Sequence, residues 1–340
     1  MMRRHHIRVW WVAAFAMVLG GCAGDDASHP MSALAPRSDL ANWCYTMLLE
    51  VTAWDTAILA IVIVAFILAV FFFSTRVGEA GPPTAVSSDL KLEIAWTLGP
   101  ALILLFISIP TVRLIFRTQP RTSFAGELPV TVIAHQWWWE FRYGDGSGAV
   151  TANELHIPLN REIHLRLISN DVIHSFWVPR LGGKRDVVPG QVNEIHLIAN
   201  TPGEYYGQCA EFCGDSHANM RFRIFVDPPE AFAAWQQEQT RPASAPPEET
   251  AARRGAQLFA DSPCTTCHTV NGVSKGYVGP DLTHLGSRTT IAAGVLANDP
   301  QHLTEWIEHP DEVKPGARMP DFGLRGPELN DLVAYLESLK

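Results

Sequence analysis

The most informative segment of the chain is Cys209-Ala-Glu-Phe-Cys213-Gly-Asp-Ser-His217-Ala-Asn-Met220. It places two thiols, an imidazole and a thioether within one short loop. Soft sulfur ligands combined with imidazole favour copper, and the methionine thioether argues against zinc. A mononuclear copper site needs a single cysteine, whereas two nearby cysteines can bridge a pair of copper ions. The loop therefore predicts a dinuclear copper centre.

Such a centre also needs a second imidazole, which must come from another part of the chain. The best candidate is His174, in the segment Val172-Ile-His-Ser-Phe-Trp-Val-Pro179. His164 and His196 alternate with apolar residues inside expected strands, so both are expected to face solvent. The sequence leaves the roles of His135 and His156 undecided.

A disulfide is the alternative for Cys209 and Cys213, because close cysteine pairs in exported proteins commonly form one. A disulfide would not explain the nearby imidazole and thioether of His217 and Met220. Metal binding is therefore the prediction for this pair.

Short β-prone segments surround the loop between residues 128 and 226. They are Val130–Ile133, Trp137–Tyr143, Ile163–Ile168, Ile195–Ile198 and Phe222–Val226. Turn residues separate them, and no helical pattern lies between them. Regular short strands of this kind predict an all-β sandwich or barrel. A helix over Pro229–Gln239 and a Pro-rich linker that ends at Glu248 follow this module.

The C-terminal part of the chain carries a second redox motif, Cys264-Thr-Thr-Cys267-His268. This spacing is the attachment pattern of a c-type haem, in which both thiols bond the haem and the histidine binds its iron. Met319 is the only methionine after residue 248 and is the predicted sixth ligand of the iron. The competing sixth ligands are His284, His302 and His309. A disulfide or a zinc site is the alternative for the cysteine pair.

Helical patterns surround the haem motif. They cover Ala251–Phe259, Gln301–Ile307 and Pro327–Leu339, and the last of them has apolar residues at helical spacing. The sequence therefore predicts an all-α haem module after the β module.

Two apolar runs precede both modules, at Thr56–Phe73 and Ala95–Phe116. Each is long enough to cross a bilayer as a helix. Arg113 is expected near the membrane surface, because a charge at mid-bilayer is costly. The short connection Ser74–Ile94 makes the pair a transmembrane helical hairpin.

The N-terminus has the features of an export signal. Arg3, Arg4 and Arg8 form a basic region, and Val9–Leu19 is a short apolar region. The segment Leu19-Gly-Gly-Cys22 resembles a lipoprotein signal with a lipidated Cys22. The alternative is an uncleaved signal with an unmodified cysteine. Counting crossings from an external residue 22 puts everything after about residue 117 outside the membrane, where c-type haems are attached.

The charge pattern excludes a nucleic-acid partner. The chain has a formal net charge of −9 and no basic stripe. Phosphate binding needs clustered Lys and Arg, which this sequence does not offer.

These motifs together resemble known respiratory proteins. Residues 48–226 resemble cytochrome c oxidase subunit II, and residues 248–340 resemble a class I cytochrome c, a fusion found in caa-type oxidases. The matching segments are Glu93-Ile-Ala-Trp96-Thr, His135-Gln-Trp-Trp-Trp139, His174-Ser-Phe-Trp-Val-Pro179, Asp186-Val-Val-Pro-Gly190, Gly203-Glu-Tyr-Tyr-Gly-Gln208 and the copper loop.

The resemblance implies a cupredoxin fold that holds the dinuclear copper centre called CuA. The ligands it implies are His174, Cys209, the backbone carbonyl of Glu211, Cys213, His217 and Met220. The Glu211 side chain would help to hold a magnesium ion at the boundary with subunit I.

The resemblance also assigns roles to two residues outside the metal ligands. Trp137 would be the tryptophan at which electrons enter the copper domain, although the run 137–139 also fits an aromatic belt near the bilayer. Trp138 departs from the family, which more often has Tyr there. Glu93 would stand at the mouth of a proton path into subunit I, with a solvated loop carboxylate as the alternative.

The implied domains follow the chain in order. They are a signal peptide at 1–21, a periplasmic segment at 22–47, the hairpin at 48–120, the cupredoxin domain at 125–228, a helix and linker at 229–247 and the cytochrome c domain at 248–340.

The implied function is that of the electron-entry subunit of a haem-copper oxidase. Electrons would pass from haem c through CuA to subunit I, where oxygen is reduced to water. No histidine lies between His29 and His135, so neither span can bind the oxygen-reducing metals. The implied partners are subunits I and III, membrane lipid, and an external donor such as a cytochrome c or complex III. The implied location is the bacterial inner membrane, with both redox domains on the periplasmic side. The alternative is a membrane-tethered electron-transfer module outside any oxidase.

Overall fold

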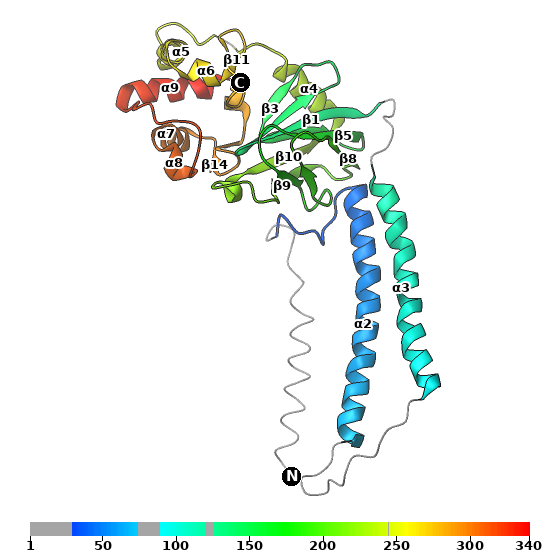
Figure 1. Ribbon diagram of the computed structural model, residues 1–340. Coiled ribbons are helices and arrows are strands. Elements are labelled where there is room, and N and C mark those ends of the chain that lie inside the picture. Colours follow the sequence, from blue (N-terminus) through cyan, green and yellow to red (C-terminus); the bar gives the residue numbers. More distant parts are fainter. Residues whose placement is uncertain (1–28, 74–88, 120–125, 244) are drawn as a thin grey trace, which may run out of the picture.

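The computed structural model describes residues 29–73, 89–119, 126–243 and 245–340. Figure 1 shows two long helices that lead to two domains lying against each other, one mainly β and one mainly α. The expected signal peptide, Cys22 and most of the hairpin connection lie outside the described residues. The expected architecture of hairpin, β domain and helical domain is confirmed.

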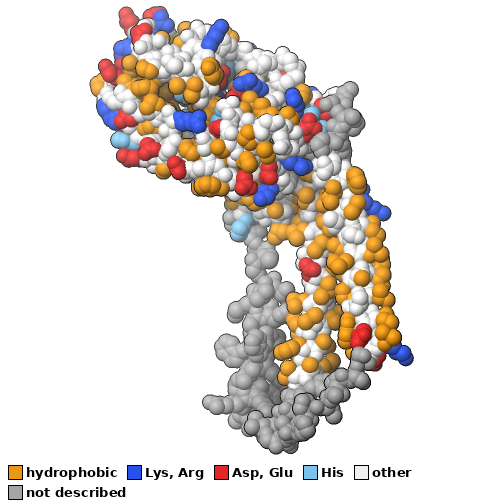
Figure 2. Space-filling view, viewed as in Figure 1, with side chains coloured by type: hydrophobic (Ala, Val, Ile, Leu, Met, Phe, Trp, Pro, Cys, Tyr) orange, Lys and Arg blue, Asp and Glu red, His pale blue; other side chains and the backbone are white. Residues whose placement is uncertain are grey.

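The hairpin consists of α2 (Asp39–Phe73) and α3 (Leu90–Thr118). Away from the start of α2, their side chains are mainly apolar and exposed, as Figure 2 shows, and both helices are long and apolar enough to cross a membrane. α2 starts much earlier than the expected span at residue 56. A helix of 35 residues is about 52 Å long, well beyond a hydrocarbon core of about 30 Å.

The extra turns of α2 attach the hairpin to the β domain. Leu40 and Ala41 are buried there. Ser38 Oγ donates to Leu181 O at 2.6 Å, and Asp39 Oδ1 accepts from the Ile198 amide at 2.8 Å. The membrane anchor and the β domain are therefore joined by packing as well as by the chain.

The β domain is a sandwich of two five-stranded sheets. The first has the order β3 (Val150–Ala152), β2 (Trp138–Tyr143), β1 (Leu128–His135), β5 (Glu162–Ser169), β8 (Asn193–Ile198). The second has the order β4 (Glu154–Pro158), β10 (Arg221–Asp227), β9 (Gly203–Cys209), β6 (His174–Trp177), β7 (Arg185–Val187). The sequence missed β3, β4, β6, β7 and β9, which are short or rich in polar residues and Gly.

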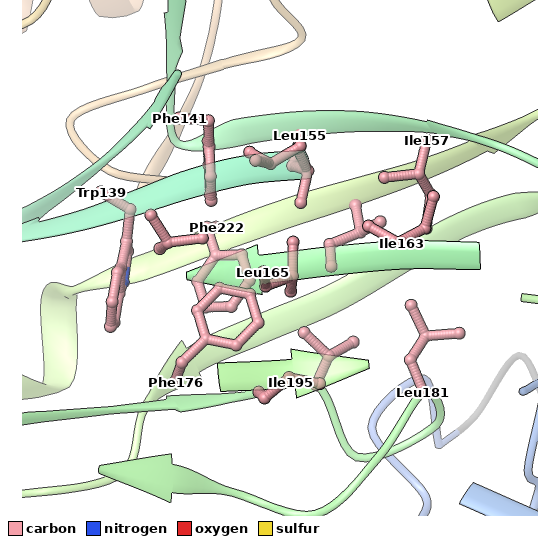
Figure 3. Close-up of a cluster of buried hydrophobic side chains, with 14 of the residues drawn as sticks. Trp139, Phe141, Leu155, Ile157, Ile163, Leu165, Phe176, Leu181, Ile195 and Phe222 are labelled. Carbon is pink, nitrogen blue, oxygen red and sulfur yellow. The ribbon is translucent and has the colours of Figure 1, made fainter. Parts of the chain in front are cut away.

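The sandwich core lies between the sheets, where both contribute large side chains (Figure 3). The fully buried ones include Trp139, Phe141, Leu155, Ile157, Ile163, Leu165 and Phe222. Alternate residues of each strand point into this layer, which is the period-two pattern that the sequence displayed. The core therefore fixes the register of β6, β9 and β10, the three adjacent strands whose ends carry the copper loop.

Two histidines do not lie where the sequence placed them. His164 and His196 were expected to face solvent, but their side chains are only 7% and 8% exposed. They are direct partners across β5 and β8 and stack with ring centroids 4.3 Å apart. Alternation along a strand reports which sheet face a residue occupies, and it does not report whether other groups cover that face.

The helical domain follows α4 (Pro229–Gln239), which packs on the sandwich through the buried Phe232. Its helices are α5 (Ala251–Asp261), α6 (Cys264–Cys267), α7 (Pro300–Glu308), α8 (Pro310–Val313) and α9 (Gly326–Ser338). Four two-residue strands, β11 (Thr269–Val270), β12 (Ser274–Lys275), β13 (Thr290–Ile291) and β14 (Leu296–Ala297), and a turn of 3-10 helix at Leu285–Ser287 complete it. α5 crosses α9 at Gly255, where a Cβ would fall 1.9 Å from Asp331 O, so only glycine allows this approach.

Candidate copper centre and haem cavity

The expected copper ligands converge at one end of the sandwich. His174 begins β6, Cys209 ends β9, and Met220 immediately precedes β10. The 3-10 turn His217–Asn219 (η1) closes the loop between β9 and β10. Because these three strands are neighbours in one sheet, residues far apart in the sequence reach a common point.

The donor atoms lie close together. Cys209 Sγ lies 3.8 Å from Cys213 Sγ, 3.9 Å from His174 Nδ1 and 3.2 Å from Glu211 O. On the other side, Cys213 Sγ lies 3.6 Å from His217 Nδ1 and 3.9 Å from Met220 Sδ. Each sulfur therefore has an imidazole beside it, with the carbonyl at one end of the cluster and the thioether at the other.

The chemistry of these donors fits a dinuclear copper site. Both cysteines are free thiols and buried. The two sulfurs are 3.8 Å apart, which is less than twice the metal–thiolate bond length of about 2.3 Å, so one ion can bond both. The hydrogen bond from Cys213 lowers the pKa of Cys209 far below that of an ordinary thiol, which favours the thiolate that metals bind.

Asp171 orients the His174 ring. Its Oδ1 accepts a hydrogen bond from His174 Nε2 at 2.8 Å, which leaves Nδ1 directed at Cys209. Burial alone would lower the pKa of His174, but the contacts with Asp171 and Cys209 outweigh it and raise the pKa. A carboxylate behind a metal-binding imidazole is a recurrent device for fixing its tautomer. The sequence interpretation missed Asp171, although its position three residues before His174 was a usable signal.

The haem motif lines a cavity of about 390 Å³. Cys264, Cys267, His268 and Met319 all border it. The competing histidines His284, His302 and His309 do not. His284 is buried elsewhere, with Nε2 donating to Arg241 O at 3.0 Å.

His268 has the environment of an iron ligand. Its Nδ1 donates to Pro280 O at 2.8 Å, so the other ring nitrogen, Nε2, is the one left for a metal. Burial lowers the pKa of His268, which keeps the imidazole neutral and able to bind. Gly279 packs on the ring so closely that a Cβ there would lie 2.6 Å from Cε1. The cavity and its donors therefore fit a covalently attached haem.

Trp137 connects the cavity to the copper loop. It borders the cavity, and its indole Nε1 donates to Cys213 O at 2.9 Å. Gln136 donates to the same carbonyl at 2.8 Å. The ring is 8% exposed and lies between the two domains, because Gly316 of the helical domain packs against it.

Lys314 is buried at this domain interface, and sequence reasoning gave no indication of it. Its Nζ donates to the carbonyl oxygens of Trp137 and Ala292. Burial lowers the pKa of this amine to about 7. Ser216 Oγ donates to Pro315 O at 2.5 Å beside it, so the turn 314–316 is held at the Trp137 loop.

Glu154 forms a second anchor between the domains. This buried carboxylate accepts hydrogen bonds from the backbone amides and hydroxyls of Thr289 and Thr290 at 2.7 to 3.1 Å. Nearby, the Arg221 amide donates to Ala293 O at 3.1 Å. Specific polar contacts therefore dock the helical domain on the copper end of the sandwich.

The chain matches known families in three segments. Residues 40–114 match the transmembrane domain of cytochrome c oxidase subunit II, residues 146–226 match its periplasmic domain, and residues 252–340 match cytochrome c. A curated protein of Alkalihalophilus pseudofirmus named cytochrome c oxidase subunit 2 is 34% identical over 338 residues, covering 95% of this chain and 94% of that protein. The chain belongs to the cytochrome c oxidase subunit 2 family.

The chain is also similar to other known proteins. The Bacillus subtilis protein named cytochrome c oxidase subunit 2 is 32% identical over 363 residues, covering 100% of this chain and 99% of that protein. The solved periplasmic domain of oxidase subunit II from Bradyrhizobium japonicum is 32% identical and matches 34% of this chain and 94% of its own, with a TM-score of 0.32.

The chain is thus subunit II of a haem-copper oxidase with a cytochrome c domain at its C-terminus. The family implies CuA, and the cytochrome c domain implies haem c. Membership of this family implies association with other oxidase subunits. The chain is anchored in a membrane, with the β domain on the periplasmic side.

Glu93 lies apart from both redox sites. It is in the first turn of α3, at the end of the hairpin remote from the copper domain (Figure 1). Since α3 is about 43 Å long, Glu93 and the copper loop are on opposite sides of any bilayer the hairpin crosses.

Proposed function

We propose that electrons pass from the cytochrome c domain to the copper domain across the docked interface, and then to subunit I. When bound, haem c and CuA supply one-electron redox chemistry. The protein contributes the ligands, excludes water and holds the two domains in one arrangement.

The proposed copper ligands are those that converge at the ends of β6, β9 and β10. They are His174, Cys209, the carbonyl of Glu211, Cys213, His217 and Met220. Their spacing and the free thiols support this assignment. The proposed haem-binding residues are Cys264 and Cys267 for the covalent bonds and His268 and Met319 for the iron, supported by their place around one cavity.

Trp137 carries the proposal for the electron route. Trp137 and Gln136 both border the haem cavity and donate to the backbone carbonyl of a proposed copper ligand, Cys213, and Trp137 is the aromatic one of the two. The Trp137 ring thus connects the cavity wall to the backbone of a proposed copper ligand through one hydrogen bond.

Trp137→Phe tests the route, because it keeps a ring and removes the indole donor to Cys213. Electron transfer would be triggered photochemically in the full, metal-loaded subunit and followed as loss of the reduced haem band and reduction of the copper band. We expect the intramolecular rate to fall, because the variant lacks the hydrogen-bonded connection between the ring and the Cys213 carbonyl. Trp235→Phe is the matched control, since Trp235 packs on His156 away from the cavity. Equal rates in the wild type and the Trp137 variant would contradict the route.

Subunit I is the proposed acceptor at the outer face of the copper loop. Glu211 is exposed there, and the Phe212 ring beside it is 76% exposed. Ile173, next to the ligand His174, is also exposed. Apolar groups on a surface beside a redox site fit a face that a partner covers. The exposed Glu211 carboxylate is available to help bind magnesium at that boundary.

The external donor is proposed to dock on the opposite edge of the haem cavity. Tyr277, Val278 and Phe322 border the cavity and are exposed, at 83%, 52% and 44%. Trp137 cannot serve an external donor directly in the docked arrangement, because the cytochrome c domain covers it. The donor would be a cytochrome c or complex III.

The remaining assignments concern the membrane. We propose that the hairpin binds lipid and subunits I and III in a bacterial inner membrane, and that Glu93 lies at a proton-path mouth on the inner side. Purification from membranes tests whether the chain belongs to an oxidase complex. If it does, subunit I should be purified together with the chain. If the chain were purified quantitatively without any haem-a-type subunit, the alternative of a separate electron-transfer module would replace this proposal.

A further inference from the structure

We infer that the copper domain holds a second metal site, for one zinc ion, built by His164, Glu194 and His196 at the edge of the first sheet. The site is distinct from the copper loop. β5 and β8 carry it at the end of the sandwich that faces the hairpin (Figure 1), whereas the opposite end of β5 leads to His174, which lies at the copper loop.

The donor atoms are already gathered. One ligand atom from each of the three residues lies within 4.8 Å of the other two. His164 Nε2 and Glu194 Oε1 are 3.4 Å apart without hydrogen-bond geometry. The two imidazoles are direct cross-strand partners, so the sheet itself holds them at ligand spacing.

Three of the four imidazole nitrogens lack hydrogen-bond partners in the described part of the chain. His164 Nε2 and both ring nitrogens of His196 are buried without one. A buried polar atom left without a partner is destabilising, and a metal ion bound to one nitrogen of each ring would satisfy two of these three atoms.

Glu127 completes the site behind His164. Its Oε1 accepts from His164 Nδ1 at 3.2 Å, which fixes the tautomer with the Nε2 lone pair turned toward Glu194. This carboxylate–histidine–metal order is typical of zinc sites. Glu162 Oε1, 3.7 Å from His196 Nδ1, supplies a fourth oxygen within reach.

The imidazole and carboxylate donors of this site favour zinc. Two neutral imidazoles and one or two carboxylates form a four-coordinate site without sulfur, which suits Zn²⁺. The three glutamates contribute three negative charges around neutral rings, and a divalent ion offsets most of that charge. Bound zinc would join β5 and β8 beside the point where Asp39 of α2 bonds the end of β8.

Zinc binding to the full, haem- and copper-loaded chain in detergent tests this inference. The chain is stripped with a mild chelator, titrated with Zn²⁺ against a chromogenic competitor and analysed for metals after gel filtration. We expect one zinc per chain with copper and haem unchanged, and a higher thermal midpoint of the copper domain with zinc. His164→Gln and His196→Gln should each abolish this zinc, while the surface control His309→Gln should retain it.

Two conservative variants distinguish a loss of zinc binding from a loss of folding. Glu194→Gln should weaken zinc binding, and Glu127→Gln, which changes only the group behind His164, should weaken it about 10- to 100-fold. Both should keep the copper and haem spectra of the wild type. A wild-type chain that binds no more zinc than the His164→Gln, His196→Gln double variant would overturn the inference. Uptake of a third copper in preference to zinc would overturn it as well.

Discussion

At the scale of single residues, the two redox sites are separable because no proposed ligand is shared between them. Met220 is fully buried in the sandwich core, whereas Met319 lies in the cavity wall of the helical domain. Each thioether therefore reports on one site.

Replacing either methionine by leucine tests this separation. A Met-to-Leu change nearly conserves volume and costs less than about 1.5 kcal/mol, so both domains should stay folded. Met220→Leu should alter the copper absorption and electron paramagnetic resonance spectra and leave the haem band intact. Met319→Leu should do the reverse, and its haem reduction potential should fall. A change of both spectra in either variant would show that the ligand assignment is wrong.

Glu140 gives the copper domain a dependence on pH. Burial alone would raise the pKa of this carboxyl, but hydrogen bonds from His135 and Arg142 outweigh it and lower the pKa below 4.5. The folded domain thus favours the carboxylate, so this stabilisation is complete above pH 4.5 and is lost as the pH falls below it.

Glu140→Gln should therefore destabilise the copper domain most at neutral pH. We expect a loss of about 1.5–3 kcal/mol at pH 7, because the hydrogen bonds no longer involve a charged acceptor. The difference from wild type should shrink below pH 4.5, as followed by the calorimetric transition of the full chain. Glu238→Gln, on an exposed ion pair with Arg241, is the control. A difference that stays constant with pH would contradict this account.

At the scale of elements, the turn 314–316 and the strand edges of the sandwich determine how the domains meet. The turn covers the Trp137 ring, and Glu154 at the start of β4 binds the Thr289–Thr290 backbone. These contacts are polar and buried, so each one that is lost leaves an unsatisfied group.

Lys314→Met tests the contribution of the turn. It keeps the length of the side chain and removes the donor to Trp137 O, which should weaken docking by about 1–3 kcal/mol, roughly a factor of 5 to 150. We expect slower haem-to-copper transfer and a larger radius in small-angle scattering. Lys275→Met, at an exposed position of β12 (Ser274–Lys275), should change neither. Docking that is unchanged in the Lys314 variant would assign the interface to Glu154 and its partners instead.

At the scale of the whole molecule, the tether and the interface contribute separately to electron transfer. The tether raises the effective concentration of one domain near the other, and this effect depends only weakly on its length. The polar contacts decide the orientation.

Lengthening the tether separates the two contributions. A flexible Gly-Ser insertion between the exposed residues Pro247 and Glu248 that doubles the tether costs about 0.6 kcal/mol, so transfer should slow by less than about threefold. The measurement is the same photochemical experiment. A loss as large as that of Lys314→Met would mean that the tether, and not the interface, positions the haem domain.

The sequence by itself determined the order of the domains and the hairpin, and it predicted the donor sets of both redox sites. Proposed ligands such as Cys209 and Cys213, or Cys264 and His268, are local in sequence, so their spacing indicates the chemistry. Strand alternation likewise located the sandwich core.

Only the tertiary structure decided what depends on contacts between distant segments. It paired His164 with His196 and buried both, placed Asp171 behind His174, and put Lys314 against Trp137. It also extended α2 into the β domain through contacts of Ser38 and Asp39. Burial and pairing across strands or domains arise from the packing of elements far apart in the chain, and no local pattern encodes them.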